Sequence, residues 1–269
     1  MNIIAVDIGN TNINVGLFLD DEEKFIKSIP GQSKAELTDL FKSAWQEVPV
    51  LKTSKEKKRD GVIVVSSVKP VWTKLIRQIV SQELGEKILL IGKEIPLPMS
   101  LWIDEPAKVG TDRVVSAAAA YAVVGNAVVV ADFGTAVTID LVDEKGIFLG
   151  GVIYPGFEMS AQALRQNTAL LPMIKVTCPK EPFGKNTADA INCGLYYSTI
   201  GALEEIINRY AEKIGKWPQT VITGSGAKII KDDCQFIDSY VPNLVVKGIV
   251  LAYKKYIEEK TGNLIEDGR

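Results

Sequence analysis

The sequence predicts an α/β protein made of two similar halves. Each half opens with an apolar strand, a turn with an acidic residue two positions before a glycine, and a returning strand. The segments VDIGNTNINVGLF and ADFGTAVTIDLV align Asp7 with Asp132 and Gly9 with Gly134, nearly half a chain length apart. A repeat at this distance indicates an internal duplication. We therefore predict two domains, residues 1–124 and 125–269.

Each half has a β-hairpin at its start. The continuous apolar run Ile3–Val6 is typical of a strand buried on both faces, and Ile13, Val15 and Leu17 alternate along the return strand. In the second half the run Val128–Ala131 is followed by a predicted return strand over Val137–Val142. Short Gly-containing turns between such strands predict hairpins.

Helical periodicity and turn residues give the remaining elements. In the first half we predict helices near Lys34–Trp45 and Val71–Leu84, a strand at Val62–Ser66, and a solvated loop over the charged run Lys52–Asp60. The second of these helices has a predicted apolar face of Val71, Leu75, Ile76, Ile79 and Val80.

In the second half a long helix is predicted from Thr187 to Lys213, with Gly215 as its stop. A strand at Thr220–Thr223, a turn at Gly224–Ala227 leading into another helix, and a final helix over Asn243–Lys260 complete the prediction.

Composition narrows the function. The 269 residues are 46% hydrophobic and 24% charged, and the net charge of −2 provides no field for nucleic acid or an anionic membrane. The chain has no histidine, which excludes His-dependent triads and His-ligated zinc. Its three cysteines form no CxxC pair, and no signal peptide is recognised, which favours a reducing cytoplasm.

One apolar stretch resembles a membrane span. Residues Val114–Ala131 are nearly all apolar, but Gly125 and Asn126 interrupt them. A span needs about 20 continuous apolar residues. We therefore predict a buried helix, a turn and a buried strand here, and no membrane association.

The first hairpin turn is suited to phosphate. Gly9 has no side chain, so a phosphate can approach the backbone, and the amides from Gly9 to Asn12 and the Thr11 hydroxyl can donate hydrogen bonds. Asp7, at the strand end, can hold Mg²⁺ through water. One such turn could be an ordinary hairpin, but the second copy at Asp132 favours the binding interpretation.

The paired hairpins resemble the phosphate loops of the acetate-kinase, sugar-kinase and actin superfamily. This resemblance implies a duplicated ribonuclease H-like (actin-like ATPase) fold, two similar domains with mixed sheets flanked by helices. It places the ATP phosphates on Asp7, Ile8, Gly9, Asn10, Thr11 and Asn12, with Thr135 completing the clamp. Thr223–Ala227, with Gly224, is in the right place to receive adenosine, although a strand–Gly–helix turn is also common.

Three further segments resemble type III pantothenate kinases. They are Gly110-Thr111-Asp112-Arg113, the Gly150–Gly156 segment with its continuation to Pro172, and Asn186-Thr187. The resemblance covers almost the whole chain in order. It implies ATP-dependent phosphorylation of pantothenate to 4′-phosphopantothenate, the first step of coenzyme A biosynthesis.

The resemblance also assigns roles. Gly110, Thr111, Asp112 and Arg113 would bind pantothenate, with Asp112 as the base, because an alcohol needs its proton removed before it attacks phosphorus. An alternative is that Asp112 only complements a helix N-terminus. Asp132 would hold a monovalent cation, K⁺ or NH₄⁺, beside the phosphates.

A homodimer is implied as well. Thr187 would reach the substrate of the neighbouring subunit, although it could instead be a helix N-cap. The stretch from Gly150 to Pro172 is more apolar than an ordinary exposed connection, which fits a subunit interface.

Three positions depart from the family pattern: Thr111 stands where alanine is usual, Ile103 where tyrosine is frequent, and Ser225 where glycine is usual. Two alternatives to the pantothenate kinase remain: another small-molecule kinase of the superfamily, and a non-catalytic regulatory protein of the same fold. Gly184-Lys185-Asn186-Thr187 resembles the end of a Walker A loop but lacks its first glycine.

Overall fold

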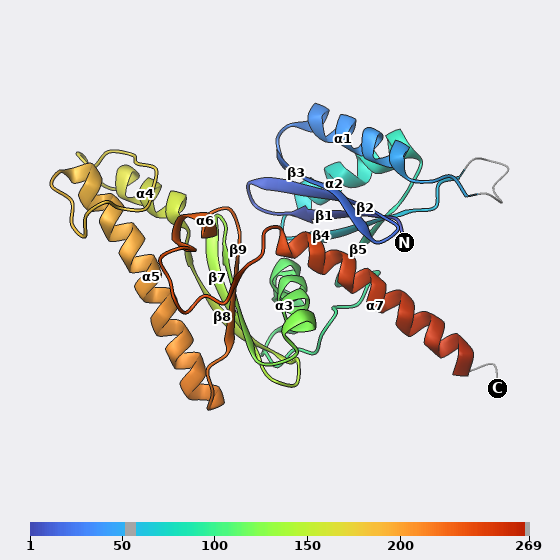
Figure 1. Cartoon of the computed structure of the whole chain (residues 1–269). Coiled ribbons are helices and arrows are strands. Elements are labelled where there is room, and N and C mark those ends of the chain that lie inside the picture. Colours follow the sequence, from blue (N-terminus) through green and yellow to red (C-terminus); the bar gives the residue numbers. More distant parts are fainter. Residues whose placement is uncertain (52–57, 267–269) are drawn as a thin grey trace. The chain divides into compact units, whose positions relative to one another are not determined.

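The computed structural model describes residues 1–51 and 58–266, which form two compact units (Figure 1). Unit 1 comprises the described residues of Met1–Met99, Ala107–Ala119 and Val245–Arg269, and unit 2 comprises Ser100–Pro106 and Ala120–Leu244. The division into domains 1–124 and 125–269 stays a prediction. Of the predicted loop Lys52–Asp60, residues 52–57 lie outside the described residues.

The described part of unit 1 contains a five-stranded sheet in the order β3-β2-β1-β4-β5. Its strands are β1 (Ile3–Ile8), β2 (Asn12–Leu19), β3 (Glu22–Pro30), β4 (Val62–Ser67) and β5 (Ile88–Leu90). The predicted hairpin is confirmed, because β1 pairs antiparallel with β2. On its other side β1 pairs parallel with β4, so the sheet is mixed.

Unit 2 repeats this plan. Its described residues form a five-stranded sheet in the order β10-β9-β6-β7-β8. The strands are β6 (Val128–Phe133), β7 (Ala136–Val142), β8 (Phe148–Pro155), β9 (Gln219–Thr223) and β10 (Ser239–Tyr240). The first strand again pairs antiparallel with the second and parallel with the fourth. The matching order and pairing confirm the predicted duplicated ribonuclease H-like fold.

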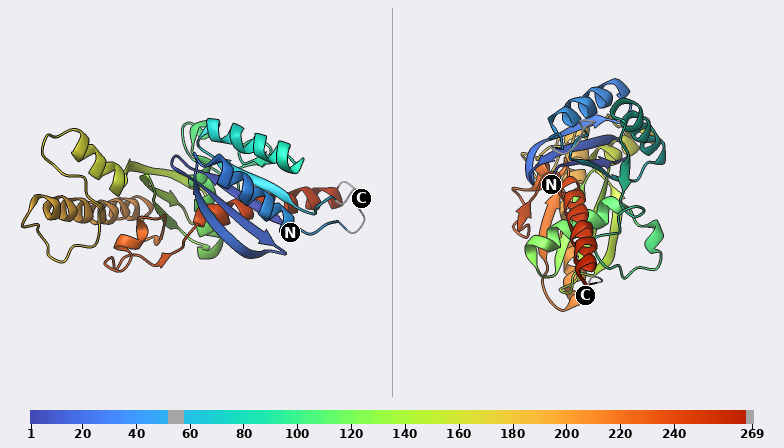
Figure 2. Two further views of the ribbon diagram at one scale, coloured as in Figure 1. Left: turned by 90° about the horizontal axis from the view of Figure 1, so that it is seen from above. Right: turned by 90° about the vertical axis from the view of Figure 1, so that its right-hand side faces the viewer.

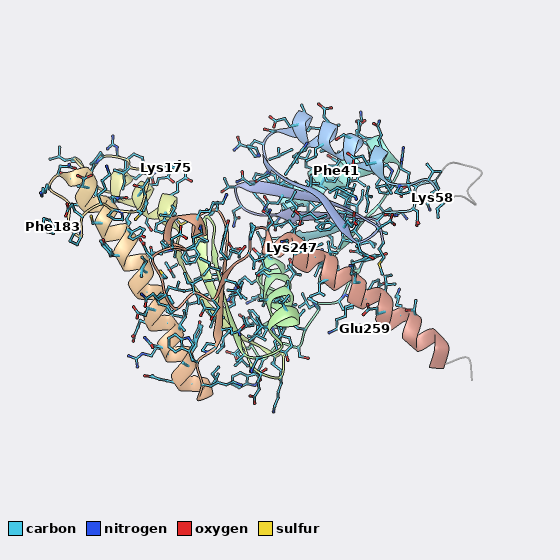
Figure 3. All side chains as sticks on the ribbon, viewed as in Figure 1. Phe41, Lys58, Lys175, Phe183, Lys247 and Glu259 are labelled. Carbon is cyan, nitrogen blue, oxygen red and sulfur yellow. The ribbon has the colours of Figure 1, made fainter. Side chains whose placement is uncertain are left out.

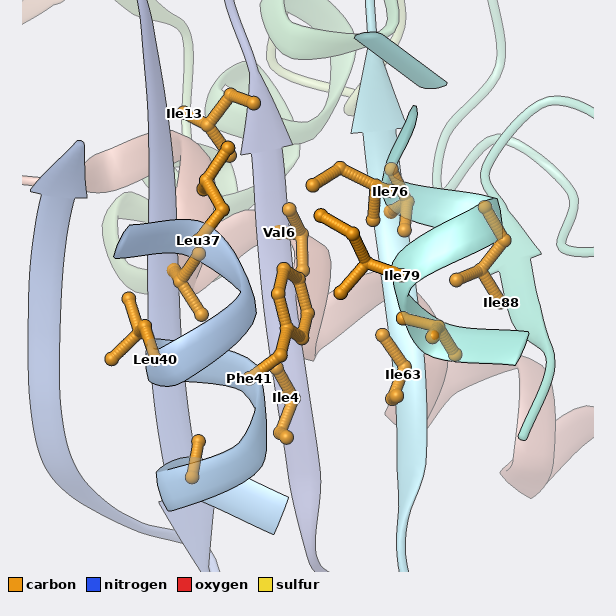
Figure 4. Close-up of a cluster of buried hydrophobic side chains, with 14 of the residues drawn as sticks. Ile4, Val6, Ile13, Leu37, Leu40, Phe41, Ile63, Ile76, Ile79 and Ile88 are labelled. Atoms are coloured by element: carbon orange, nitrogen blue, oxygen red, sulfur yellow. The ribbon is translucent and has the colours of Figure 1, made fainter. Parts of the chain in front are cut away.

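The first sheet is covered by helices on both faces (Figures 1 and 2). Helix α1 (Lys34–Glu47) buries Leu37, Leu40, Phe41, Ala44 and Trp45, the spacing of a single helical face. Phe41 and Leu37 pack with Ile4 and Val6 of β1 (Figure 4). On the other face helix α7 (Leu244–Glu266) packs against Ile3 and Ala5. Both faces of β1 are therefore apolar.

The second helix of unit 1 differs from its prediction. Helix α2 spans Pro70–Ile79 and continues as a π-helix over Val80–Leu84, which Gly85 ends in the left-handed conformation. The predicted apolar face is wrong at its first residue, because Val71 is 72% exposed while its neighbour Trp72 is buried. The indole provides more apolar area for the core than a valine side chain.

The apolar stretch near the middle of the chain forms a helix and a strand, as predicted. Helix α3 spans Thr111–Val124, after a 3₁₀ turn at Pro106–Lys108, and Gly125 adopts φ +64° before β6. None of the helices in the described residues is long and apolar enough to cross a membrane.

Helix α5 (Thr187–Ile214) packs in the core of unit 2, where its residues Tyr196, Leu203 and Ile207 are buried with residues of β6 and β7. Gly215 ends it with φ +75°, as predicted. Helix α6 (Ala227–Ile230) follows the Gly-rich turn after β9. The stretch from Gly150 to Pro172, whose apolar residues predict a subunit interface, contains most of β8 and helix α4 (Phe157–Gln166).

Candidate active site

The first hairpin loop lies at the end of β1 in unit 1. Asp7 is one of the few polar residues buried there, and its Oδ2 accepts a 2.9 Å hydrogen bond from Asn14 Nδ2. The Gly9 N–H donates to the Asn12 carbonyl at 3.1 Å and closes the turn. Asn10, Thr11 and Asn12 are exposed. The loop thus presents backbone and hydroxyl groups to solvent above a carboxylate whose orientation is fixed.

The segment Gly110–Arg113 is joined to the same strand end. Ser66 of β4 is the register partner of Asp7 and is completely buried. Its Oγ lies 2.8 Å from Thr111 Oγ1 in a hydrogen bond. Thr111 directly precedes Asp112, so this bond links the strand end at Asp7 to the start of α3. The threonine that replaces the usual alanine therefore has a structural role in unit 1.

Asp112 lies in the first turn of α3 and is half-buried. Its Oδ1 accepts a 2.9 Å hydrogen bond from the Arg113 N–H. Burial raises the pKa of this carboxyl above its ordinary value, and the hydrogen bond to Arg113 opposes that shift only in part. A raised pKa makes a carboxylate a stronger base. The predicted base is therefore placed in surroundings that increase its basicity.

Gly110 provides room for this carboxylate. A Cβ atom at position 110 would lie 2.5 Å from Asp112 Oδ1. Real Cβ contacts essentially never approach so closely, so a side chain here would force the carboxylate to move.

In unit 2 the second hairpin loop packs against the Gly-rich turn after β9. Asp132 and Thr223 are register partners, and Gly224 follows with φ +88°. A Cβ at Gly224 would lie 2.4 Å from Asp132 Oδ1. The Gly226 N–H donates to the Phe133 carbonyl at 2.9 Å. The predicted cation residue and the predicted adenosine turn are thus adjacent within this unit.

The backbone of Thr135 is held by the segment at the start of α4. The Gly156 N–H donates to the Thr135 carbonyl at 3.0 Å, and a Cβ at Gly156 would lie 2.3 Å from the Gly134 carbonyl oxygen. Only a glycine permits this approach. The Gly150–Gly156 segment therefore supports the second hairpin loop.

Thr187 is the first residue of α5, and the alternative interpretation of it as an N-cap is wrong. The cap is Asn186, whose Oδ1 accepts from the Asp189 N–H at 2.9 Å. Gly184 packs directly on this turn, because a Cβ there would lie 2.0 Å from the Ala190 nitrogen. Thr187 itself is exposed.

The predicted site residues therefore fall into two groups. Asp7, the 8–12 loop and the Gly110–Arg113 segment belong to unit 1, whereas Asp132, Thr135, Thr187 and Gly224 belong to unit 2. Sequence reasoning missed Asn14, Ser66 and Lys69, whose contacts depend on strand register and on the start of α2. For Ser66 the sequence did contain a signal, because a polar residue stands there at the end of an apolar strand.

Comparisons with known proteins match nearly the whole chain. A family model described as type III pantothenate kinase matches residues 3–209. Among relatives of that name, one from Agathobacter rectalis is 34% identical over 94% of this chain and 97% of its own length. Another, from Bifidobacterium animalis subsp. lactis, is 36% identical over 95% of this chain and 100% of its own.

A third relative of that name, from Moorella thermoacetica, is 32% identical over 94% of this chain and 99% of its own. Among solved structures, a conserved Campylobacter jejuni protein described as a Baf family transcriptional activator superposes with a TM-score of 0.59. It covers 97% of this chain and 100% of its own at 20% identity, a likeness of fold.

Proposed function

Because this chain belongs to the type III pantothenate kinase family, we propose that it transfers the γ-phosphoryl group of ATP to pantothenate. The product is 4′-phosphopantothenate, in the first step of coenzyme A biosynthesis. The observation that carries the proposal is the near full-length similarity to relatives of that name. The position of Asp112 at the strand end that carries the first phosphate loop supports it.

In this mechanism Asp112 accepts the proton of the primary hydroxyl of pantothenate as that oxygen attacks the γ-phosphorus. Its raised pKa suits this step, because a base is most effective when its pKa lies near the working pH. The backbone and the Thr11 hydroxyl of the first loop, and Thr135 of the second, would donate to phosphate oxygens whose charge is redistributed during transfer.

Two ions are part of the proposal. Within the described residues no cluster of three or more Cys, Asp or Glu side chains could hold a metal alone. Mg²⁺ does not need one, since it is commonly held by one or two carboxylates together with substrate phosphates and water. Asp7, a nearly buried carboxylate fixed by Asn14, fits that role. Bound Mg²⁺ would neutralise charge on the β- and γ-phosphates.

The monovalent cation, K⁺ or NH₄⁺, is assigned to Asp132. A Cβ at position 224 would lie 2.4 Å from Asp132 Oδ1, so a side chain there would displace this carboxylate. An ion carried there fits the electrostatic need of a site that binds a triphosphate.

Pantothenate recognition is assigned to Arg113 and its neighbours. A guanidinium can bind the pantothenate carboxylate with two parallel hydrogen bonds. In unit 2, Ile103 stands where the family often has tyrosine, and a Cβ at Gly150 would contact its Cγ2 at 3.5 Å. This places Ile103 beside the Gly150–Gly156 segment.

We also propose a homodimer in which Thr187 completes the pantothenate pocket of the neighbouring subunit. Unit 2 exposes several large apolar side chains, among them Ile153 on β8. Phe183, before α5, is another (Figure 3). Leu170, just after α4, is 90% exposed. Apolar surface of this kind usually meets a partner. In the same stretch Tyr154 and Phe157 pack against the core of unit 2.

The cytoplasm is the proposed location. It supplies ATP, and it keeps thiols reduced, which suits the free cysteines Cys178, Cys193 and Cys234.

An ATP-consumption assay tests the proposed function. The chain is incubated with Mg²⁺ and ATP, with and without K⁺, against pantothenate, acetate, glycerol and a panel of sugars. We expect consumption only with pantothenate and stimulation by K⁺. Consumption with another acceptor would favour a different kinase of the superfamily, and none with any acceptor would favour a regulatory protein.

A further inference from the structure

A lysine outside the family-related motifs lies against the first phosphate loop. Lys69 Nζ donates a 2.7 Å hydrogen bond to the carbonyl oxygen of Asn10, the second residue of the exposed turn. We infer that Lys69 is a further nucleotide-binding residue whose ammonium group contacts the polyphosphate. The inference rests on the proposed function, because it assigns the ligand of the same loop.

The backbone at Lys69 is fixed beside the loop. The N–H of Val68 donates to the carbonyl of Ile8 at 3.1 Å, which extends the β4–β1 pairing to the start of the turn. Lys69 then adopts an extended conformation as the N-cap of α2, and Pro70 follows it. A proline disfavours the helical conformation for the residue before it. The Lys69 N–H donates to Ser67 Oγ at 3.2 Å.

The side chain is held as firmly as the backbone. Lys69 Nζ lies 3.4 Å from the centroid of the Trp72 ring, a cation–π contact. Trp72 in turn packs tightly over Gly31, where a Cβ would lie 2.2 Å from the indole. The Gly31 N–H donates to the Thr11 carbonyl at 3.2 Å. The Lys69 side chain is therefore ordered before a ligand binds. This lowers the entropic cost of binding, because the side chain does not have to be fixed at that step.

The charge of Lys69 is available to an anion. Across residues 1–51 and 58–266 its ammonium group contacts the Asn10 carbonyl and the Trp72 ring, and forms no ion pair with a carboxylate. An ammonium group has three N–H donors. Lys69 thus has no carboxylate partner among the described residues, and it lies against a loop whose amides suit phosphate. This arrangement favours contact with a polyphosphate over a role in the fold alone.

The competing role is structural: Lys69 could only brace the Asn10 carbonyl. The two roles predict different effects of a Lys69 substitution on the binding of ATP, ADP and AMP. Direct contact with the polyphosphate strengthens binding of ATP and ADP and does not affect AMP, whose single phosphate lacks the β- and γ-groups. A brace on the loop changes the loop for every ligand.

The test is calorimetric titration of the full chain with ATP, ADP and AMP in Mg²⁺, without pantothenate. Lys69→Met keeps an unbranched side chain but removes the charge, and Lys69→Arg restores a cation. Lys74→Met is the matched control, because Lys74 is an exposed lysine on the same helix. Loss of a charge-assisted hydrogen bond corresponds to about 10- to 100-fold in affinity.

We expect Lys69→Met to bind ATP and ADP about 10- to 100-fold more weakly, with AMP within about twofold of the parent. Lys69→Arg should recover most of the loss, and Lys74→Met should match the parent. If Lys69→Met binds all three nucleotides equally more weakly, or none of them more weakly, the inference is overturned. It is also overturned if Lys69→Arg prefers ATP and ADP over AMP no more than Lys69→Met does. A parent that binds ATP but phosphorylates no pantothenate defeats the proposed function alone, and one that binds no nucleotide defeats both.

Discussion

Replacing Gly110 with alanine should displace the carboxylate of Asp112 and slow phosphoryl transfer. The added Cβ would lie 2.5 Å from Asp112 Oδ1, roughly 1 Å closer than an ordinary contact. The carboxylate must therefore move by about that distance. A misplacement of about 1 Å can cost about 10²-fold in rate. We expect kcat to fall by about two orders of magnitude, while the KM for ATP changes little.

The assay is steady-state production of 4′-phosphopantothenate, together with thermal unfolding of each variant. Gly201→Ala is the control, since a Cβ at this position in α5 would meet nothing within 4 Å apart from the neighbouring backbone of its own helix. The double variant Gly110→Ala/Asp112→Asn isolates the cause. If Gly110 acts through Asp112, the double variant should be no slower than Asp112→Asn, because the two effects are not additive. Parent-like turnover by Gly110→Ala, or additive losses in the double variant, would refute this reasoning.

The site supports four other predictions. Asp7→Ala should raise the apparent KM for Mg·ATP, whereas Asp132→Ala should chiefly abolish activation by K⁺; a K⁺ titration that activates the Asp132 variant like the parent would contradict the second assignment. Because burial raises the pKa of Asp112, kcat/KM should fall with decreasing pH at a pH above 3.8, the ordinary value, and a pH–rate profile checks this. The same shift makes folding less favourable as pH rises from 3.8 through the raised pKa, so Asp112→Asn should unfold at no lower temperature than the parent at pH 7. Mixing Asp112→Asn with Thr187→Ala should restore activity, because one site of the mixed dimer carries neither defect; a monomer by sedimentation, or no recovery despite demonstrated exchange, would contradict a shared pocket.

Much of the fold could be predicted because the duplication is visible in the sequence. Asp7 and Asp132 each follow a fully apolar run, and their strands occupy equivalent positions in two sheets of the same order. The long helix α5 and its glycine stop were also predictable, because their signals are local. Strand β3 was missed, because it is largely exposed and its charged residues hide any alternation.

The stretch after the second hairpin shows a different limit. Its apolar residues predicted a subunit interface as a group, yet alternate residues of β8 face opposite ways, so that Tyr154 packs against the core of unit 2 while Ile153 is exposed. Such alternation is a property of a strand, and composition alone does not distinguish a strand from a loop.

The site residues themselves were predicted from motifs, but their supports were not. Ser66 reaches Thr111 only because β4 pairs in parallel with β1, and Lys69 reaches Asn10 only because α2 begins where it does. Both contacts join residues more than 40 positions apart in the sequence. No local pattern encodes such a contact, since it depends on strand order and register.

The central claim is that Asp112 of this chain is the base for phosphorylation of pantothenate by ATP. Its most direct test is a rapid-quench single-turnover experiment with γ-labelled ATP, Mg²⁺, K⁺ and pantothenate, comparing the parent with Asp112→Asn. The account predicts label in 4′-phosphopantothenate with the parent, and a rate lower by about 10²- to 10⁴-fold with the variant at unchanged ATP affinity. Transfer by the variant at the rate of the parent, or no transfer to pantothenate by the parent, would contradict it.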